Sequence, residues 1–373
     1  MKQLTTIFTL FSLIYSGFCS CAATALSADD PIPFPTGDRL RDIVQRNYPE
    51  GNVLIGATTG AALLGSDTGA VLDREFSYVT PENDFKQWSF HPDPETWTWE
   101  RPDAWVKHIA ENGQVLRMHC PVSPQCSSWA QDDARTAQEL ETNLREFLTA
   151  VCKRYNGVPG FDYMDVVNET TQNNQWKKNA PGRGWEVPWY IIGQDTDRNK
   201  TPLYIKMAFE IATKHAPDIK LIYNHHEDMN KEGSWQLIKD TVGYLRAQGL
   251  RVDGIGWQAH VDNGWATPGN VEKLEALIDW AHANHLEFHV TEASVWQKHG
   301  VTPQTLEDQA YTYAKIVEVL ISKRSTGVVG WNTWHIGDNT GWHREWFGAI
   351  FDRELKPKPA YYAIQKVLED GVK

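Results

Sequence analysis

Residues 163–169, Tyr-Met-Asp-Val-Val-Asn-Glu, contain the pattern that decides the fold. Apolar and β-branched residues lead directly into the amide of Asn168 and the carboxylate of Glu169, and a polar segment, residues 170–174, follows. A short apolar run bounded by turn-forming residues is typical of a buried strand in a parallel sheet. The carboxyl end of such a strand is where a (β/α)8 barrel holds its catalytic residues. A lone glutamate there can also simply cap the next helix.

A second stretch has the same construction and also ends on a glutamate. Residues 286–292, Leu-Glu-Phe-His-Val-Thr-Glu, run from apolar and β-branched side chains to Glu292. In a parallel barrel the carboxyl ends of the strands meet at one rim, so we expect Glu169 and Glu292 to lie together there. Two carboxyl groups flanking one position are the arrangement that hydrolyses glycosidic bonds. The pair therefore favours a catalytic role over a capping role.

Strand-like and helix-like segments alternate along the rest of the chain. Eight strand-like runs are expected at residues 54–58, 76–81, 115–120, 163–168, 220–224, 254–259, 287–291 and 327–332. Helix-like segments, with apolar residues three and four apart, include residues 137–155, 202–215, 234–248, 271–285 and 303–324. This alternation predicts an α/β fold, a (β/α)8 TIM barrel that forms a single domain over residues 37–373. The longest irregular insertion, residues 170–200, lies on the face where a barrel builds specificity.

Composition and net charge limit the kinds of molecule that this protein is expected to bind. The chain has 373 residues, of which 41% are hydrophobic and 23% charged, an ordinary composition for a globular protein. Its 36 basic and 48 acidic residues give a net charge of −12, and no basic cluster stands out. We therefore expect neither nucleic acid nor an anionic membrane as a partner. Seventeen tryptophans suit the apolar faces of sugar rings, although the count alone does not separate binding from core. We expect a monomer without a cofactor.

The first residues are typical of an export signal. Lys2 supplies the positive end, residues 7–18 the apolar run, and Ala23-Thr24-Ala25 a small-x-small cleavage site. The run is too short to span a membrane comfortably. We therefore expect a signal peptide at residues 1–25, a Pro-rich leader at residues 26–36, and a secreted or periplasmic protein. Lipid anchoring at Cys21 is the alternative, but the residues before it make a poor lipidation motif.

Cysteine and histidine patterns do not predict a metal site. Beyond the leader only Cys120, Cys126 and Cys152 remain, so at most one disulfide forms, and a Cys120–Cys126 bridge would close a short loop. The adjacent His225 and His226 precede a glutamate, a pattern that at first suggests metal ligands. Neighbouring residues on an extended strand point to opposite faces, so only one of the two can reach a pocket. We expect no metal.

Five short motifs resemble those of family-10 glycoside hydrolases, the group dominated by endo-β-1,4-xylanases. Residues 80–86, Thr-Pro-Glu-Asn-Asp-Phe-Lys, resemble that family's Thr-Pro-Glu-Asn-x-x-Lys, and residues 117–119, Arg-Met-His, resemble its Arg-Gly-His. Residues 165–169 match its acid/base strand, residues 256–260, Gly-Trp-Gln-Ala-His, its Gln-x-His strand, and residues 290–292 its nucleophile strand. The resemblance covers nearly the whole chain beyond the leader, with the five motifs in the family's order.

The resemblance implies a role for each matching residue. Glu169 would be the acid/base and Glu292 the nucleophile, while Asn168 would hydrogen-bond the 2-hydroxyl of the sugar and His260 would orient Glu292. Trp331 and Trp342 resemble the tryptophan pair over the catalytic sugar, and Trp334 is an alternative to either. The polar residues that would hold sugars are Glu82, Asn83, Lys86, His119 and Gln258. For Lys86, a structural salt bridge is the alternative.

The chain also departs from the family pattern around the sugar site. Residues 120–125, Cys-Pro-Val-Ser-Pro-Gln, stand where the family has a tryptophan and a second histidine. Ser294 stands where an aspartate usually pairs with the histidine that corresponds to His260, so His260 lacks its partner unless Glu227 substitutes. The insertion at residues 170–200, rich in Lys, Arg and Trp, could contact a substituent or an acidic sugar.

We therefore expect a secreted, retaining, endo-acting β-glycosidase, an endo-β-1,4-xylanase that hydrolyses xylan by a two-carboxylate double displacement. The changed residues leave open the same chemistry on a decorated xylan or another β-linked polysaccharide. A non-catalytic glycan-binding barrel is the alternative of a different class, although such a protein would not need both glutamates.

Overall fold

A computed structural model describes residues 32–178 and 187–371. The expected signal peptide and most of the expected leader lie outside the described residues. Pro33–Lys373 form one compact unit. In the part of the chain that the structure describes, no helix is both long enough and apolar enough to cross a bilayer.

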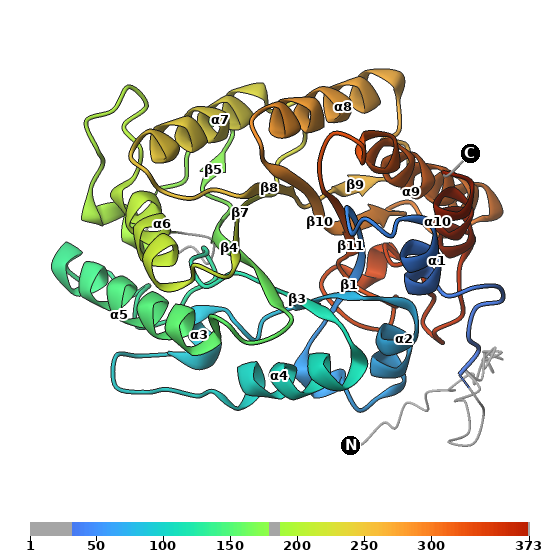
Figure 1. The fold of residues 1–373 in the computed structure, drawn as a ribbon, viewed down its shortest axis with the longest axis horizontal. Coiled ribbons are helices and arrows are strands. Elements are labelled where there is room, and N and C mark those ends of the chain that lie inside the picture. The colour runs from blue at the N-terminus through green and yellow to red at the C-terminus, as the bar shows by residue number, and fades with distance from the viewer. Residues whose placement is uncertain (1–31, 179–186, 372–373) are drawn as a thin grey trace, which may run out of the picture. The chain divides into compact units, whose positions relative to one another are not determined.

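Eight parallel strands close into a barrel, which confirms the predicted (β/α)8 fold (Figure 1). Around the barrel the order is β1-β2-β3-β4-β7-β8-β10-β11, and β11 pairs with both β10 and β1. The strands are β1 (Val53–Thr59), β2 (Tyr78–Pro81), β3 (Val115–Met118), β4 (Phe161–Asn168), β7 (Lys220–His225), β8 (Gly254–Trp257), β10 (Glu287–Trp296) and β11 (Val329–Thr333). Each of the eight expected runs overlaps one of these strands, so hydrophobic pattern and turn signals located all of them.

The helices form a ring outside the strands in Figure 1. They are α1 (Leu40–Asn47), α2 (Asp67–Glu75), α3 (Gln87–Phe90), α4 (Glu100–Asn112), α5 (Ala137–Tyr155), α6 (Leu203–His215), α7 (Glu232–Ala247), α8 (Pro268–Ala283), α9 (Pro303–Lys323) and α10 (Pro359–Asp370). The five expected helices correspond to α5 through α9. Helix α5 begins at a reciprocal capping box between Thr136 and Glu139, an arrangement that stabilises a helix start by about 1 kcal/mol.

The barrel interior is filled, as in a packed core. Tyr78, Tyr163 and Ile222 form a buried cluster inside the strands. Nearer the carboxyl ends, the guanidinium of Arg117 pairs with the Asp165 carboxylate, and both side chains are fully buried. Burying a charge pair is costly, and the hydrogen bond from Arg117 Nη2 to the Thr291 carbonyl at 2.7 Å offsets part of that cost. This polar layer forms the floor on which the site stands.

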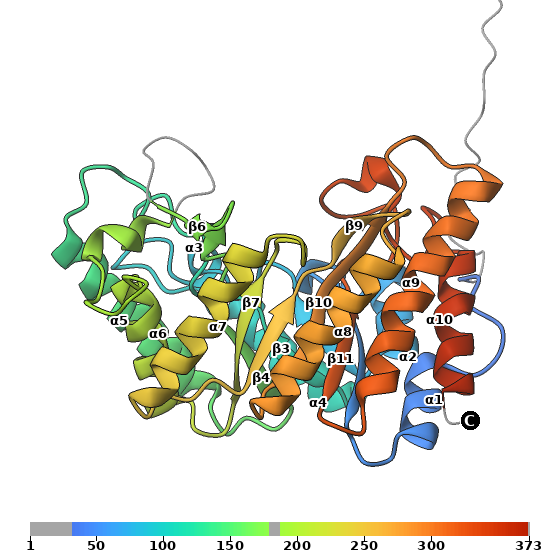
Figure 2. The same cartoon turned by 90° about the horizontal axis from the view of Figure 1, so that it is seen from above.

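Three short strands outside the eight of the barrel were not predicted. A small hairpin joins β5 (Thr171–Gln172) to β6 (Gln175–Trp176), and β9 (His260–Asp262) pairs with the end of β10. In Figure 2 the labels of β6 and β9 lie toward the edge at which the barrel strands end. The pairing with β9 explains why β10 continues past Glu292 to Trp296. These additions hold the side chains that surround the two glutamates.

Candidate active site

A cleft of about 540 Å³ opens at the carboxyl ends of the barrel strands. Its lining combines carboxylates, amides, cations and three tryptophans, the mixture that a sugar-binding site requires. The lining residues are Glu82, Asn83, Lys86, His119, Gln125, Asn168, Glu169, Gln172, Lys177, His226, Gln258, His260, Glu292, Trp296, Trp334 and Trp342.

Irregular backbone directs both glutamates into this cleft. Glu169 follows β4 directly and has a φ of 54°, in the left-handed region that non-glycine residues rarely adopt. Glu292 lies where the register between β10 and β11 shifts, between Val290 and Ala293. Such a bulge changes the direction of a side chain that regular alternation would send elsewhere. Strained or irregular backbone of this kind is concentrated at functional sites.

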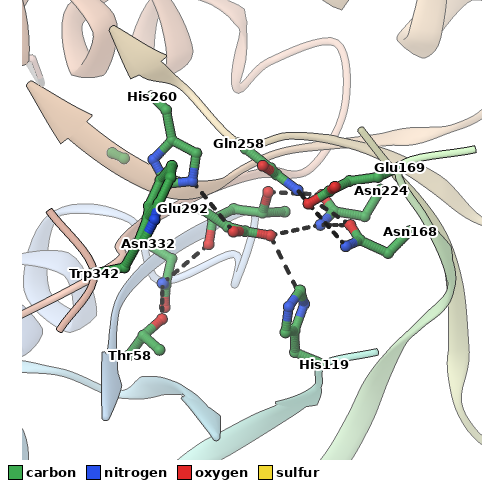
Figure 3. A network of polar contacts seen from close by, with 12 residues as sticks. Thr58, His119, Asn168, Glu169, Asn224, Gln258, His260, Glu292, Asn332 and Trp342 are labelled. Carbon is green, nitrogen blue, oxygen red and sulfur yellow. Dashed lines mark hydrogen bonds and ion pairs between the residues drawn. The ribbon is translucent and has the colours of Figure 1, made fainter. Parts of the chain in front are cut away.

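A chain of amides joins the two carboxylates (Figure 3). Asn224 Nδ2 donates to Glu292 Oε1 at 2.8 Å and to Asn168 Oδ1 at 2.9 Å. Gln258 Nε2 donates to Asn168 Oδ1 at 3.1 Å and to Glu169 Oε1 at 3.0 Å. Asn168 Nδ2 completes the connection with a 3.2 Å hydrogen bond to Glu169 Oε1. The network therefore fixes both carboxylates relative to one another and to the amide of Asn168.

His119 is held as a cation beneath the nucleophile candidate. Its Nδ1 donates to Asp165 Oδ2 at 2.8 Å and lies 3.8 Å from Glu292 Oε1, and its Nε2 lies 3.2 Å from Cys120 Sγ. Burial alone would lower the pKa of His119, but the sulfur of Cys120 and the Glu292 carboxylate raise it to about 10. Both ring nitrogens of His119 contact protein atoms. We therefore infer that His119 acts on Glu292 through its positive charge.

Glu292 is stabilised in its ionised form. Burial opposes ionisation, but the charge of His119 and the contact with His260, whose Nε2 lies 3.4 Å from Glu292 Oε2, hold the pKa of Glu292 below its ordinary value. The charge of Arg117 acts in the same direction. An ionised, buried carboxylate with fixed hydrogen-bond donors has the properties of a nucleophile.

Glu169 has different surroundings on its second oxygen. Lys177 Nζ lies 3.4 Å from Glu169 Oε2, and both side chains are largely buried. Burial alone would raise the pKa of Glu169, but His226 and Lys177 hold it well below its usual range. The two carboxylates are thus set in distinct environments, one over an imidazolium and one beside an ammonium.

Of the nine residues that the sequence predicts to contact the sugar, eight line the cleft. The ammonium of Lys86 contacts Gln125 Oε1, so its hydrogen bond goes to an amide and the structural salt bridge considered for it is not the contact observed. Burial raises the pKa of Glu82, against the opposing charge of Lys86. The eight are Glu82, Asn83, Lys86, His119, Asn168, Gln258, His260 and Trp342.

Trp331 is the exception, and its assignment to the sugar site was wrong. Its side chain is only 2% exposed and packs edge-on against Tyr313 of α9, on the outer face of the barrel wall. Successive residues of a strand point to opposite faces, and the following Asn332 points inward, where it donates to Thr58 Oγ1 at 2.7 Å. Trp334, the alternative considered, lines the cleft in its place.

His260 does not obtain its carboxylate partner from Glu227. That carboxylate contacts His225 and Ser234, both away from the cleft. Instead, the His260 ring stacks on Trp296 with an interplanar angle of 1° and a centroid distance of 5.6 Å. Within the described residues, His260 Nδ1 has no hydrogen-bond partner. The ring is thus supported by an aromatic face on one side, while its Nε2 lies 3.4 Å from Glu292 Oε2.

Only one of the two adjacent histidines lines the cleft, as alternation predicts. His226 lines the cleft, whereas His225 is fully buried against Glu227 and Trp235. Burial lowers the pKa of His226 to about 4. Residues 32–178 and 187–371 contain no group of three His, Cys, Asp or Glu side chains arranged to hold a metal ion.

The disulfide considered between Cys120 and Cys126 is absent. Both residues and Cys152 are buried free thiols. Cys120 Sγ is directed to His119 Nε2, so it contributes to the polar layer beneath Glu292. Burial raises the pKa of Cys126 and of Cys152 to about 12, which makes these two thiols unreactive near neutral pH.

Several lining residues were not assigned to the site from sequence. Trp296 was noted only as one tryptophan of many, although it lies two residues beyond Ser294 on the strand that carries Glu292. The hairpin β5–β6 turns the chain after Glu169 back toward it, and this places Gln172 and Lys177 in the cleft. In the sequence, the feature that could have identified Lys177 is the polar loop directly after the strand that leads to Glu169. Residues 179–186 of the same insertion lie outside the described residues.

Known proteins of one family resemble this chain. The profile described as glycosyl hydrolase family 10 matches residues 44–367. Endo-1,4-beta-xylanase A of Caldicellulosiruptor saccharolyticus is 31% identical over 334 residues, which cover 83% of this chain and 92% of that protein. Endo-1,4-beta-xylanase B of Thermotoga neapolitana is 27% identical over 312 residues, 81% of this chain and 84% of that protein.

Solved structures share the fold. Native xylanase 10B from Thermotoga maritima superposes with a TM-score of 0.77 at 25% identity, covering 90% of this chain and 99% of that chain. Xylanase 10B from Thermotoga petrophila RKU-1, solved in complex with xylobiose, gives a TM-score of 0.78 at 24% identity, covering 91% of this chain and 100% of that chain.

Proposed function

Because the chain belongs to glycosyl hydrolase family 10, we propose that it is an endo-β-1,4-xylanase that retains configuration, with Glu169 as acid/base and Glu292 as nucleophile. The observation that carries the proposal is the amide network that connects the two buried carboxylates inside one cleft. The names of the two relatives described above, both endo-1,4-beta-xylanases, support xylan as the polymer and cleavage within the chain.

In the first step of the proposed reaction, Glu292 attacks the anomeric carbon while Glu169 protonates the glycosidic oxygen. The bond from the anomeric carbon to that oxygen breaks, its electron pair stays with the departing sugar, and a glycosyl ester with Glu292 forms. His119 and His260 keep Glu292 ionised before attack. Asn168, held by Asn224 and Gln258, presents its amide to the sugar bound above Glu292, where a hydrogen bond to the 2-hydroxyl strengthens in the transition state.

In the second step, a water molecule hydrolyses the ester. Glu169, now ionised, takes a proton from the water as its oxygen attacks the anomeric carbon, and Glu292 departs as a carboxylate. Two inversions give net retention. The ammonium of Lys177 favours the ionised form of Glu169 that this step requires. A retaining mechanism requires carboxyl groups roughly 5–5.5 Å apart. Here two amides in sequence, those of Asn224 and Asn168, connect Glu292 to Glu169.

The tryptophans would supply the apolar surface of the sugar site. Trp342 is 47% exposed beside His260, and Trp334 lies against His119 at a centroid distance of 5.0 Å. Aromatic faces pack against the C–H faces of sugar rings, while the polar side chains of Glu82, Asn83 and Lys86, which line the same cleft, match hydroxyl groups.

The test is reducing-end release from linear xylan, glucuronoarabinoxylan, mixed-linkage glucan, cellulose and mannan. We expect hydrolysis of xylans, and loss of at least about 1000-fold for Glu169→Ala and Glu292→Ala on xylan, because each removes a group that acts in the transition state. Proton NMR of the first product should show the β-anomer. Release of the α-anomer would contradict retention, and equal activity of parent and variants would contradict the catalytic assignment.

We also propose that the protein is exported. The proposal rests on residues 1–25 of the sequence, with a cationic end, an apolar run and a small-x-small site. Expression of the full chain in a secreting bacterium should yield extracellular or periplasmic protein whose amino terminus is Leu26. An intracellular product that retains Met1, or a lipidated Cys21, would contradict it.

A further inference from the structure

A second pocket, of about 260 Å³, lies outside the catalytic cleft and has about half its volume. The two share no lining residue. One wall of the second pocket is a face of α5, whose lining residues recur three or four positions apart and therefore lie in rows along the helix. Trp129, from the loop after β3, lines the pocket as well. The residues of α5 are Gln138, Glu139, Thr142, Asn143 and Glu146.

The ring of Trp129 is held in place by its own loop. Gln131 N–H donates to the Ser127 carbonyl at 3.1 Å, and Ala130 N–H donates to Ser127 Oγ at 3.1 Å, so Trp129 lies within a closed turn. The guanidinium of Arg135 lies over the half-buried indole, 4.8 Å from the ring centroid. An aromatic surface that is already fixed loses little conformational freedom when a ligand packs against it.

Asn143 brings an unpaired hydrogen-bond donor to the same pocket. Gln87 Oε1 accepts from Ser127 N–H at 2.8 Å, so Gln87 Nε2 is the atom that donates to Asn143 Oδ1, at 3.0 Å. This bond fixes the orientation of the Asn143 amide. The side chain is only 2% exposed, and its Nδ2 has no hydrogen-bond partner within the described residues. A buried donor without a partner is rare in folded proteins, and an acceptor supplied by a ligand would satisfy it.

These groups match a sugar. An indole ring packs against the C–H face of a pyranose, while an amide donor and a carboxylate acceptor bind its hydroxyl groups. Asn143 supplies the donor, and the exposed carboxylate of Glu146 supplies the acceptor. The pocket therefore combines an aromatic surface with a few fixed polar groups, as carbohydrate recognition requires.

The charges around the pocket favour a neutral sugar over an acidic one. Among the described residues, no lysine or arginine lines it. The nearby guanidinium of Arg135 already pairs with Asp132 at 3.3 Å and with Glu139 at 3.4 Å. A uronic acid would meet the carboxylates of Glu139 and Glu146 without a free cation, and like charges repel.

Two segments connect this pocket to the catalytic cleft. The loop after β3 contributes Gln125 to the cleft and Trp129 to the pocket. Lys86 lines the cleft, and the next residue, Gln87, begins α3 and contacts Asn143 on α5, which lies beside α3 (Figure 1). One long polymer can therefore contact both places, and a second contact raises the effective concentration of the chain at the cleft.

We propose that this pocket is a second carbohydrate-binding site, in which the Trp129 ring and Asn143 Nδ2 bind a neutral segment of xylan. The choice of xylan as the polymer rests on the proposed function, whereas the site itself rests on the pocket and its unpaired donor. The site performs no chemistry. It retains the polymer on the enzyme, so it acts on long chains and not on short substrates.

The first test counts binding sites for xylotetraose by isothermal titration calorimetry in the Glu292→Ala variant. We expect two sites, and the further change Trp129→Ala should weaken one of them about ten-fold through loss of ring stacking. Thr142→Arg places a long side chain in the pocket from an exposed position of α5 and should weaken the same site without removing a packed ring. Trp280→Ala is the matched control, because Trp280 of α8 is also half-buried under a cation, with Lys239 Nζ 5.1 Å from its ring centroid. It should leave both sites unchanged.

The second test compares substrates in the hydrolytically active protein. Trp129→Ala and Thr142→Arg should lower the rate on insoluble xylan by up to about ten-fold, because the polymer loses one of two contacts. Both variants should leave kcat/KM on an aryl β-xylobioside unchanged, since that substrate occupies only the cleft. An equal loss on both substrates would mean that the changes disturb the cleft, and would overturn the inference.

The remaining outcomes separate this inference from the proposed function. A single site in Glu292→Ala, or two sites that neither variant affects, would overturn the inference alone. Tighter binding of an acidic xylo-oligosaccharide at this site would overturn the neutral class of ligand. A dimer in sedimentation equilibrium that dissociates in Trp129→Ala would show that a second copy of the chain occupies the pocket instead. Binding that depends on Trp129, in a parent that does not hydrolyse xylan, would contradict the proposed function and support the site.

Discussion

Removal of the Asn224 side chain tests the amide network most directly. Asn224 is fully buried at the carboxyl end of β7, and its amide donates to both Glu292 Oε1 and Asn168 Oδ1. Its own oxygen accepts from Thr291 Oγ1 at 2.7 Å, which fixes the orientation of the amide. Asn224→Ala leaves both glutamates in the chain and deletes the group that links the nucleophile candidate to Asn168.

The expected loss follows from the contacts. A hydrogen bond to a charged group contributes about 1.5–3 kcal/mol. Glu292 keeps its contacts with His119 and His260, so the loss should be that of one such bond together with the disturbed position of Asn168. We expect a cost of about 2–3 kcal/mol in transition-state stabilisation, which corresponds to a decrease in kcat/KM of roughly 30- to 150-fold. Most of the decrease should appear in kcat, because positioning of the nucleophile matters most in the transition state.

The assay is steady-state hydrolysis of linear xylan and of an aryl β-xylobioside, at a temperature where circular dichroism shows each variant folded. Asn332→Ala is the matched control. Asn332 is also a buried asparagine of a barrel strand, and it donates to Thr58 Oγ1 and to the Thr291 carbonyl. It should lose stability but keep kcat/KM within about three-fold. Activity of Asn224→Ala above one third of the parent, or an equal loss in Asn332→Ala, would refute the role of the network.

Three further predictions concern the tryptophans, the pH dependence and the thiols. Trp342→Ala should raise KM for xylan by up to about ten-fold through loss of ring stacking, whereas Trp331→Phe should leave KM unchanged; steady-state kinetics measure both. The acidic limb of kcat/KM should lie below pH 4.5, because the pKa of Glu292 is lowered. His119→Gln removes the adjacent cation, so the limb should move to higher pH. Thiol titration of the denatured, unreduced protein without residues 1–25 should give three thiols: Cys120, Cys126 and Cys152.

The same pKa shifts fix the sign of the pH dependence of stability. The folded pKa of Glu292 is below its unfolded value, so the stability that its ionisation contributes is present above about pH 4.5 and is lost as the pH falls. The folded pKa of His119 is raised to about 10, so its contribution is full below about pH 6.5 and is lost as the pH rises through 10. The melting temperature should fall at both extremes, and the alkaline loss should be smaller in His119→Gln.

Each of these predictions has an opposing result. A raised KM in Trp331→Phe would mean that its ring reaches the sugar. An acidic limb that does not move in His119→Gln would mean that this cation does not act on Glu292. A single titratable thiol would mean that a disulfide forms in the folded protein.

The sequence by itself determined the barrel and the position of its two glutamates. Apolar runs that end on Asn168–Glu169 and Glu292 identify strands, and parallel strands of a closed barrel bring their carboxyl ends to one rim. Both features are local in the chain, because burial of a strand and its ending are decided by residues within a few positions. For the same reason alternation predicted that only one of His225 and His226 reaches the cleft.

The tertiary structure alone decided how the walls of the cleft are built. Trp331 was expected over the sugar, but the register of β11 turns Asn332 inward and Trp331 outward against α9. Glu227 was considered as the partner of His260, but the path of β9 beside β10 gives that ring the face of Trp296. The hairpin after β4 carries Lys177 back to Glu169. These contacts join residues from different strands and loops, and their geometry depends on register shifts and loop paths that no local pattern encodes.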